Sequence, residues 1–225
     1  MKFAKRKDYL DWIDSQECYQ TMTLPSKIKI KGKFNTDKRI SYLEKLNFNN
    51  KNILDIGCNS GQYCIFAKQN NANQVYGIDL NKIRIEQAKI LATNESLEIN
   101  FLNEDINKFN FPNNINIDYI FCFAVITEIS DIFSVLNFLK KHTHNIALIE
   151  MKLSEPLFYF SKNLKYYFNY FKKKTYTAEI YKHMHAGWVF HPSLKFIKHF
   201  FGKNFEIKYI NKGMRYDFIS IKKLS

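Results

Sequence analysis

The stretch NILDIGCNSGQY, from Asn52 to Tyr63, limits the possible folds of this chain more than any other segment. A short apolar run reaches an acid, Asp55, and the chain then turns through two glycines, Gly57 and Gly61. A strand that ends in a glycine turn and leads into a helix is the usual start of a nucleotide-binding parallel sheet. The stretch therefore predicts an α/β fold with a ligand site at the carboxyl end of this strand.

The rest of the chain alternates apolar runs with helical patterns, which is typical of a parallel sheet with crossover helices. We predict five parallel strands followed by an antiparallel hairpin, because only a few residues around Lys212 and Gly213 separate the last two runs. In chain order the runs are NILDIG (52–57), QVYGIDL (74–80), LEINFLNED (97–105), IDYIFCFAV (117–125), NIALIEMK (145–152), FEIKYI (205–210) and YDFISIKK (216–223). The predicted fold is a Rossmann-like α/β domain with a seven-stranded, mostly parallel sheet and an antiparallel C-terminal hairpin.

Three helices between the strands have recognisable starts. Asp131 is expected to cap IFSVLNFLKK, whose apolar residues at helical spacing form one buried face (Ile132, Val135, Leu136 and Leu139). Asn81 precedes KIRIEQAKILA in the same way. Pro192 is expected to open SLKFIKHFF, a helix with apolar residues along one side (Leu194, Ile197 and Phe201).

Two segments fall outside this pattern. Residues 1–50 are expected to form an N-terminal extension and residues 51–225 the main domain, with an insertion at residues 153–191 between the fifth and sixth strands. The insertion begins with EPLFYFSKNLKYYFNYFKKKTYT (155–177), whose apolar residues recur at helical spacing, so we predict a helical lid. Its interleaved aromatic residues and lysines could instead stack on nucleic acid bases or lie at a membrane interface.

The formal net charge of the chain is +13 at pH 7. A charge of this size indicates an anionic partner such as a nucleic acid, a nucleotide sugar, a phosphorylated acceptor or a membrane face. However, the lysines are scattered rather than gathered in one block, and a general bias toward Lys, Asn, Ile, Phe and Tyr explains the charge equally well. Both interpretations stay open.

The four cysteines include no C-x-x-C pair, which predicts buried reduced thiols rather than a disulfide framework or a zinc site (Cys18, Cys58, Cys64 and Cys122). No apolar run reaches the length of about 18 residues that a membrane-spanning helix needs. The first residues also lack the continuous apolar core of a signal peptide. We therefore expect a cytoplasmic protein.

The glycine turn indicates which ligand the fold binds. A dinucleotide site of the form G-x-G-x-x-G would need glycines where Asn59 and Gln62 stand, so a pyrophosphate ligand is disfavoured. The turn instead resembles the first motif of class I S-adenosylmethionine-dependent methyltransferases, with Asp55, Gly57, Asn59 and Gly61 at its positions. Asn59 replaces the family's middle glycine, and asparagine tolerates the left-handed backbone better than most residues.

Acids at the next two strand ends extend the resemblance. Asp79 closes VYGID and resembles the acid that binds the ribose hydroxyls, while Asp105 closes NFLNED and resembles the acid beside the adenine amine, with Ile106 next to the ring. Asp55 is expected to attract the ammonium group. The resemblance implies S-adenosylmethionine as the cofactor, and three further residues are expected to complete its site (Cys58, Leu80 and Phe123).

Three islands of sequence resemble the relatives of the tRNA wobble-uridine carboxymethyltransferase: YQTMTLPSKIKIKG (19–32), LDIGCNSGQY (54–63) and WVFHPSLKFIKHFF (188–201). That resemblance implies carboxy-S-adenosylmethionine as an alternative donor and tRNA as an alternative acceptor. Against it, Thr127 and Glu128 replace the Tyr-His pair of that group, and a carboxylate would repel an anionic donor. Arg215 matches an arginine of the group, so the alternative stays open.

Methyl transfer from a sulfonium needs alignment, and a hydroxyl acceptor also needs a base. Glu128 follows the fourth predicted strand and is the first candidate for that base, unless it only stabilises a helix start. His183 and His185 are the second candidates, unless they pack in the lid, and no acid cluster or thiol completes a metal site with them. Acceptor contacts are expected from three more residues (Trp188, His191 and Arg215).

Taken together, these features predict O-methylation of a small polar or anionic acceptor, such as a sugar, a glycan precursor or a phosphoryl metabolite. One alternative is a tRNA-modifying methyltransferase or carboxymethyltransferase. Another is a non-catalytic, cofactor-binding partner subunit. The acceptor, the methylated atom and the oligomeric state do not follow from the residues.

Overall fold

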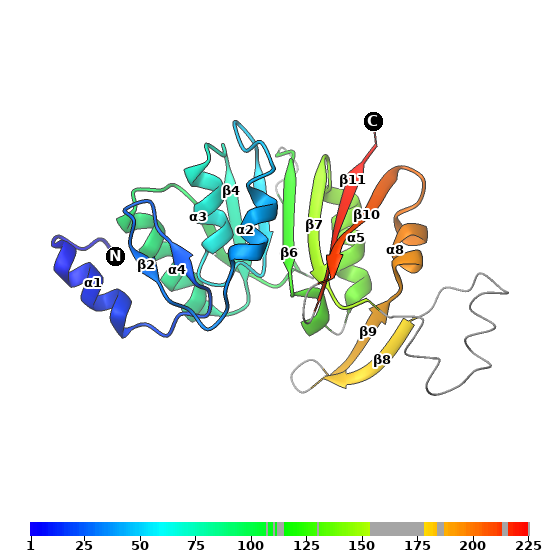
Figure 1. The fold of residues 1–225 in the computed structure, drawn as a ribbon, viewed down its shortest axis with the longest axis horizontal. Coiled ribbons are helices and arrows are strands. Elements are labelled where there is room, and N and C mark those ends of the chain that lie inside the picture. The colour runs from blue at the N-terminus through cyan, green and yellow to red at the C-terminus, as the bar shows by residue number, and fades with distance from the viewer. Residues whose placement is uncertain are drawn as a thin grey trace. The chain divides into compact units, whose positions relative to one another are not determined.

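All seven predicted strands are present and form one sheet in the order β10-β11-β7-β6-β3-β4-β5 (Figure 1). Their bounds are β3 Ile53–Ile56, β4 Val75–Asp79, β5 Asn100–Asn103, β6 Tyr119–Phe123, β7 Ile146–Met151, β10 Phe205–Lys212 and β11 Asp217–Lys223. Strand β4 pairs in parallel with β3 and with β5. Strand β11 pairs antiparallel with both β7 and β10. The predicted sheet and its C-terminal hairpin are confirmed.

The computed structural model describes residues 1–106, 108–109, 111, 115–129, 131–153, 178–183, 187–212 and 216–224. The chain divides into two compact units, Met1–Tyr119 and Ile120–Ser225.

In the first unit, strand β3 is buried along its whole length and is followed by helices α3 (Gln62–Gln69) and α4 (Lys82–Asn94). These two helices pack on strands β3, β4 and β5. Helix α4 begins as predicted, because the Asn81 side chain accepts a 3.2 Å hydrogen bond from the Arg84 backbone N–H.

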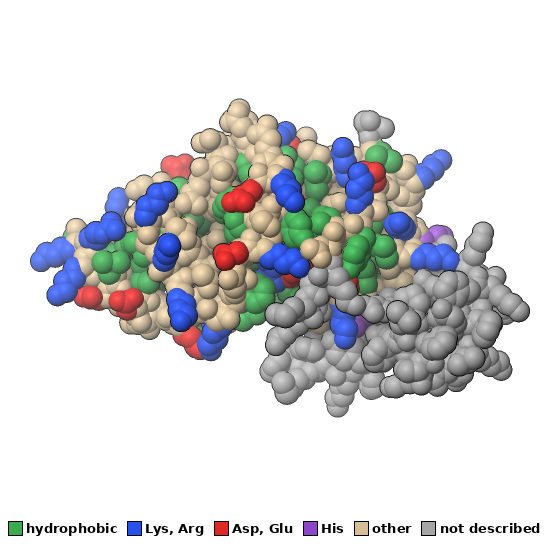
Figure 2. Space-filling model, in the orientation of Figure 1, with side chains coloured by type: hydrophobic (Ala, Val, Ile, Leu, Met, Phe, Trp, Pro, Cys, Tyr) green, Lys and Arg blue, Asp and Glu red, His purple; other side chains and the backbone are tan. Residues whose placement is uncertain are grey.

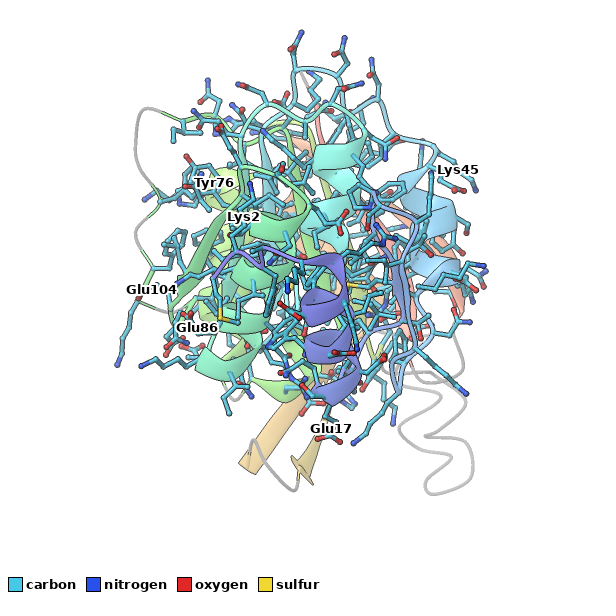
Figure 3. The ribbon with its side chains drawn as sticks, turned by 90° about the vertical axis from the view of Figure 1, so that its left-hand side faces the viewer. Lys2, Glu17, Lys45, Tyr76, Glu86 and Glu104 are labelled. Atoms are coloured by element: carbon cyan, nitrogen blue, oxygen red, sulfur yellow. The ribbon has the colours of Figure 1, made fainter. Side chains whose placement is uncertain are left out.

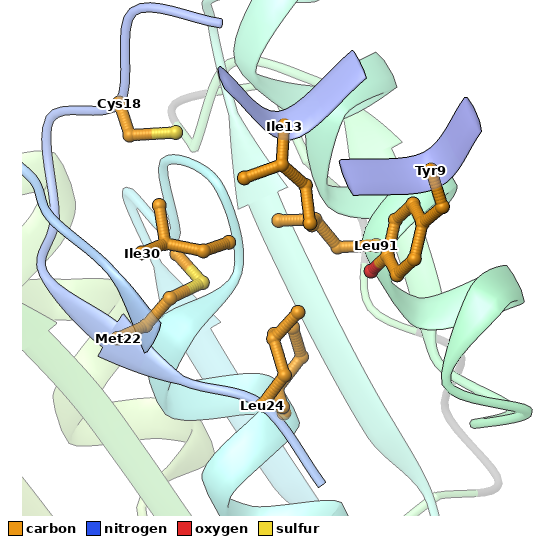
Figure 4. Packing of buried hydrophobic residues seen from close by; sticks show 8 residues of the cluster. Tyr9, Ile13, Cys18, Met22, Leu24, Ile30 and Leu91 are labelled. Carbon is orange, nitrogen blue, oxygen red and sulfur yellow. The ribbon is translucent and has the colours of Figure 1, made fainter. Parts of the chain in front are cut away.

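The first fifty residues pack onto these helices. They form α1 (Arg6–Ser15), β1 (Met22–Thr23), β2 (Lys29–Ile30) and α2 (Asp37–Leu43). Their apolar side chains join residues of α3 and α4 in one cluster, shown in Figure 4 (Tyr9, Ile13, Cys18, Met22, Leu24, Ile30, Ile65 and Leu91).

Polar contacts also attach the first fifty residues to the end of α4. Glu95, just after α4, accepts hydrogen bonds of 2.7 Å from both the backbone N–H and the hydroxyl of Ser26. It also accepts one of 3.4 Å from the Tyr9 hydroxyl. At the surface, Glu17 forms an ion pair with Lys33, and Figure 3 shows Glu17 just beyond the end of α1. The extension therefore contacts the rest of the first unit through both apolar and polar side chains.

In the second unit, a short 3-10 helix η1 (Ile126–Glu128) follows β6, and helices α5 (Ile132–His142) and α8 (Leu194–Phe201) precede β7 and β10. Asp131 caps α5 as predicted, because its side chain accepts a 3.1 Å hydrogen bond from the Ser134 backbone N–H. The predicted buried face of α5 is confirmed (Ile132, Val135, Leu136 and Leu139).

The predicted start of α8 at Pro192 is wrong. Pro192 is the last residue of β9 (Gly187–Pro192), and α8 begins at Leu194. Ser193 is the N-cap because its hydroxyl accepts a 3.1 Å hydrogen bond from the Phe196 backbone N–H, a role that proline cannot perform. Ile197 and Phe201 are buried as predicted, whereas Leu194 is only half-buried.

Strand β9 pairs antiparallel with β8 (Ala178–His183) in a separate two-stranded sheet. This hairpin was not predicted. Its strands, AEIYKH and GWVFHP, lack a clear period-two pattern, which is the main sequence signal for a strand. The helix predicted at 155–177 lies outside the described residues.

All four cysteines are buried, as predicted. No helix in the described part of the chain has the length and apolarity needed to cross a membrane. On the face seen in Figure 2, the basic side chains are spread over the surface and do not gather in one block.

Candidate cofactor site and catalytic residues

The turn between β3 and α3 has a left-handed backbone at every second residue. Gly57, Asn59 and Gly61 have φ values of 70°, 51° and 86°. Asn59 thus adopts the conformation predicted for it in place of a glycine. Gly61 cannot be replaced freely, because an added Cβ would lie 2.7 Å from Phe101 Cζ and 3.1 Å from Ala88 Cβ. The turn therefore brings backbone, rather than side chains, close to the end of β3.

Asp79 fixes this turn to the end of β4. Its Oδ2 accepts a 2.9 Å hydrogen bond from the Asn59 backbone N–H, and its Oδ1 accepts one of 2.8 Å from Asn81 N–H. Each carboxylate oxygen has two lone pairs, so both can still accept a hydrogen bond from a diol. Asn103, at the end of β5, donates to the carbonyl oxygens of Asp79 and Leu80 at 2.9 and 2.8 Å. The carboxyl ends of three neighbouring strands are thereby joined.

Asp55 lies at the centre of this arrangement and is 1% exposed. Burial raises the pKa of Asp55 to about 8, the Cys64 thiol and Arg39 act to lower it, and Asp79 raises it further. Cys64 Sγ lies 3.6 Å from Asp55 Oδ2. Asp55 Oδ1 is buried and has no hydrogen-bond partner among the described residues. A buried acceptor of this kind fits a cationic hydrogen-bond donor on a ligand, such as an ammonium group.

Arg39, from α2, was not among the predicted site residues. It is 6% exposed, its guanidinium carbon lies 4.3 Å from the centroid of the Phe34 ring, and its NH1 donates a 3.0 Å hydrogen bond to the Tyr63 hydroxyl. Its effect on the pKa of Asp55 shows that its charge acts at the end of β3. In the sequence it is one basic residue among many, and only its burial distinguishes it.

Gln62 is a second residue that sequence reasoning missed. It is the first residue of α3 and is 6% exposed. Its Oε1 is buried without a hydrogen-bond partner in the described parts of the chain. Together with Asp55 Oδ1, it is a second buried acceptor beside the glycine turn.

The other predicted cofactor residues differ in their surroundings. Asp105 is half-buried, Ile106 is 8% exposed and Leu80 is 71% exposed. Cys58 is fully buried, and its Sγ packs against Gly77, where an added Cβ would lie only 2.9 Å away. The predicted contact of Cys58 with the cofactor therefore gains no support. Phe123, in the second unit, packs with its ring centroid 5.3 Å from that of Phe218.

The predicted catalytic residues belong to the second unit. Glu128 is the last residue of η1 and is exposed, and η1 packs against β9. Strand β9 carries Trp188 and His191, of which His191 is 1% exposed. His183 ends β8 and pairs in register with Gly187. His185 and Arg215 lie outside the described residues.

Within the described ranges, no group of three or more His, Cys, Asp or Glu side chains could hold a metal ion. The buried acceptors and half-buried carboxylates of the first unit instead fit an organic ligand that carries hydroxyl and amino groups.

Residues 53–145 match a family model described as a methyltransferase domain. Over 59 residues the chain is 36% identical to the ribosomal protein L11 methyltransferase of Shewanella woodyi, which covers 26% of this chain and 20% of that protein. The chain thus spans about a fifth of the length of this curated relative.

Solved structures with a similar fold include the N-terminal domain of EvdMO1 with S-adenosylhomocysteine (SAH) bound, at a TM-score of 0.68, 10% identity and coverage of 99% of this chain and 98% of that one. An S-adenosylmethionine-dependent methyltransferase from Mesorhizobium loti matches at a TM-score of 0.58 and 10% identity, covering 84% and 98%. Magnesium protoporphyrin IX methyltransferase from Synechocystis PCC 6803, also with SAH bound, matches at 0.56 and 15% identity, covering 84% and 81%. At these identities the similarity establishes a shared fold.

Proposed function

We propose that the protein is a class I S-adenosylmethionine-dependent methyltransferase that methylates an oxygen of a small polar or anionic acceptor. In support, residues 53–145 match a methyltransferase domain model, and the chain has the fold of solved methyltransferases. Acceptors of this class include a sugar, a glycan precursor and a phosphoryl metabolite. The observation that carries the proposal is the arrangement at the carboxyl ends of β3 and β4. There Asp79 accepts a hydrogen bond from the glycine turn, and the Oδ1 of buried Asp55 can accept one from a cation.

The cofactor that this site would hold is S-adenosylmethionine, which supplies a methyl group on a sulfonium. Asp55 would accept from the ammonium group and Asp79 from the ribose hydroxyls. Asp105 and Ile106 would meet the adenine, and exposed Leu80 would cover the adenosine. Supporting this assignment, the glycine turn offers backbone for close approach, and acids stand at the ends of three neighbouring strands.

We assign Arg39 and Gln62 to the amino-acid end of the cofactor. Arg39 is a buried cation whose charge already acts on Asp55, and a guanidinium suits a carboxylate because it donates in a planar fork. Gln62 offers a buried amide oxygen at the start of α3. This assignment gives the N-terminal extension a function, since α2 carries Arg39.

Glu128 is the proposed general base, which takes the proton from the acceptor hydroxyl as the methyl group is transferred. Its support is an exposed carboxylate on the segment that follows β6, next to the strand that carries Trp188 and His191. Trp188, His191 and Arg215 stay the proposed acceptor contacts. His183 and His185 stay the second candidates for the base.

The experiment is a turnover assay that measures SAH formation with a panel of sugar phosphates, nucleotide sugars and bulk tRNA. Glu128→Gln should reduce turnover at least about 100-fold while leaving SAH binding unchanged, because general-base catalysis contributes about 10²–10⁴-fold. The control is Asp131→Asn, a nearby exposed acid that caps α5. Equal turnover by Glu128→Gln and wild type would remove Glu128 from the mechanism.

The second candidate function is tRNA modification with carboxy-S-adenosylmethionine, and its support is the net charge of +13. It predicts tRNA binding that weakens steeply with salt, because neutralised phosphates release counterions. Turnover only with tRNA, or only with the carboxylated donor, would favour this candidate. Cofactor binding without turnover on any acceptor would instead favour a non-catalytic partner subunit.

A further inference from the structure

Helices α5 and α8 of the second unit contact each other through a cluster of aromatic rings that methyl transfer does not require. The centroid of the Phe133 ring lies 6.1 Å from that of Phe196 and 6.5 Å from that of Phe200. Phe196 and Phe200 stack at 6.2 Å. With the basic residues of the same two helices (Lys140, Lys141, Lys195, Lys198 and His199), these rings form what we call the aromatic-basic face.

Phe133 lies on the outward side of α5 and is 46% exposed. The buried side of the helix already has a complete row of apolar residues (Ile132, Val135, Leu136 and Leu139). Phe133 shares the outward side with exposed Asn137, Lys140 and Lys141, which follow it at helical spacing. Phe133 and the half-buried rings of Phe196 and Phe200 together leave an apolar patch among basic residues, and a patch with a polar rim is typical of an interaction surface.

The charge of the face is entirely positive. Neither α5 nor α8 contains an Asp or Glu residue. The nearest acid along the chain, Asp131, is engaged in capping α5. Basic residues in the last turn of a helix also complement the helix dipole, which accounts for part of this pattern. The dipole does not account for Phe133, which stands in the first turn of α5.

Lys140 holds the two helices together. Its Nζ donates a 2.7 Å hydrogen bond to the Phe200 carbonyl oxygen and lies 5.3 Å from the centroid of the Phe200 ring. Lys140 and the ring cluster therefore form one fixed contact between the two helices, and the other basic residues of α5 and α8 lie on these same helices.

We propose that the aromatic-basic face binds the surface of an anionic phospholipid membrane. Phe133 enters the boundary between headgroups and acyl chains, while Lys141 and Lys198 meet the anionic headgroups. Neither helix contains an acidic residue, and an exposed aromatic ring lies among their basic residues. This combination is complementary to such a surface in both polarity and charge. The rings pack against one another, so their faces are less available for nucleic acid bases to stack on, which disfavours a single-stranded nucleic acid as the partner.

The test is co-sedimentation of the full chain with vesicles of phosphatidylcholine alone and with vesicles that contain an equal part of phosphatidylglycerol. We expect binding to the mixed vesicles that weakens with salt, and at least about ten-fold weaker binding to phosphatidylcholine alone. Phe133→Ser and the double variant Lys141→Glu/Lys198→Glu should each weaken binding to the mixed vesicles by about ten-fold or more.

Two matched controls separate this face from general effects. Leu224→Ser removes an apolar side chain that is 47% exposed, and Lys31→Glu/Lys82→Glu makes the same charge change on exposed residues of the first unit. Both controls should bind like the wild type, and circular dichroism should show all variants folded. No binding to the mixed vesicles, or equal binding by all variants, would overturn the proposal.

Two further outcomes would also contradict a membrane partner. One is a dimer in size-exclusion chromatography that Phe133→Ser converts to a monomer, since the face would then join two copies of the chain. The other is tighter binding to polyuridylic acid than to the mixed vesicles. Neither outcome depends on methyl transfer, so the membrane proposal can fail while the proposed function holds.

Discussion

The backbone N–H of Asn59 donates a 2.9 Å hydrogen bond to Oδ2 of Asp79, which joins the turn after β3 to the end of β4. The other carboxylate oxygen of Asp79 accepts from Asn81 N–H just before α4. One side chain thus sets the geometry of two consecutive strand ends. The geometry of the proposed cofactor site depends on this contact more than on any other.

Replacing Asp79 by Asn should weaken SAH binding by at least about ten-fold and lower the free energy of unfolding by about 1–3 kcal/mol. The amide can accept only one of the two backbone hydrogen bonds and places a donor against the other. Calorimetric titration with SAH and urea unfolding measure the two effects. Glu86→Gln, which breaks an exposed ion pair with Lys89, should change the unfolding free energy by less than about 1 kcal/mol. Equal SAH affinities for all three proteins would contradict the prediction.

Gly61→Ala should destabilise the protein more than Gly202→Ala. Both glycines have a positive φ, 86° with ψ 16° at Gly61 and 76° with ψ −172° at Gly202, so both replacements strain the backbone, by about 1–3 kcal/mol each. Only at Gly61 does the added Cβ also meet other side chains, with Phe101 Cζ at 2.7 Å, whereas nothing lies within 4 Å at Gly202. Thermal unfolding of the two variants checks this. A similar loss in both would mean that the turn does not pack closely on β5.

The buried carboxyl of Asp55 should make stability depend on pH. Its pKa is about 8 in the folded protein and about 4 in the unfolded chain. Between these values the folded protein holds a proton that the unfolded chain has released, so the free energy of unfolding falls as pH rises and levels off above about pH 8. Asp55→Asn removes this contribution. We expect the wild type to lose up to about 1.4 kcal/mol per pH unit relative to Asp55→Asn between about pH 5 and pH 8.

Urea unfolding of both proteins at a series of pH values measures that difference. A difference that stays constant across this range, or that changes in the opposite direction, would show that Asp55 is not held protonated in the folded protein.

Arg39→Met should weaken SAH binding by about ten-fold, because the variant keeps the aliphatic volume but loses the charge and the hydrogen bond to Tyr63. Arg39→Lys keeps the charge without the planar donor and should show an intermediate loss. Lys38→Met, the same change at an exposed residue of α2, should bind like the wild type. Calorimetric titration with SAH gives the three affinities. Wild-type affinity in Arg39→Met would remove Arg39 from the proposed site.

The sequence could predict the features that depend on local pattern. Apolar runs with acids and glycines at their ends identified all seven strands of the large sheet, since strand periodicity and turn residues are local signals. The caps Asn81 and Asp131 followed from the same reasoning. The left-handed backbone of Asn59 was also predictable, because few side chains tolerate that conformation.

Features that depend on tertiary packing could not be predicted. Arg39 and Gln62 look like ordinary polar residues of two helix starts, and only the folded structure shows that they are buried. The β8–β9 hairpin has no strong alternation, so nothing local distinguished it from a lid loop. Ser193 and Pro192 are both common at helix starts, and the structure shows that the hydroxyl makes the cap.

The central claim is that the end of β3 and β4 binds the cofactor of methyl transfer, and isothermal titration of the full chain with SAH tests it most directly. We expect saturable binding of one molecule per chain, with a clear loss of affinity in Asp79→Asn. No measurable binding at millimolar ligand, or binding that Asp79→Asn does not change, would contradict the claim.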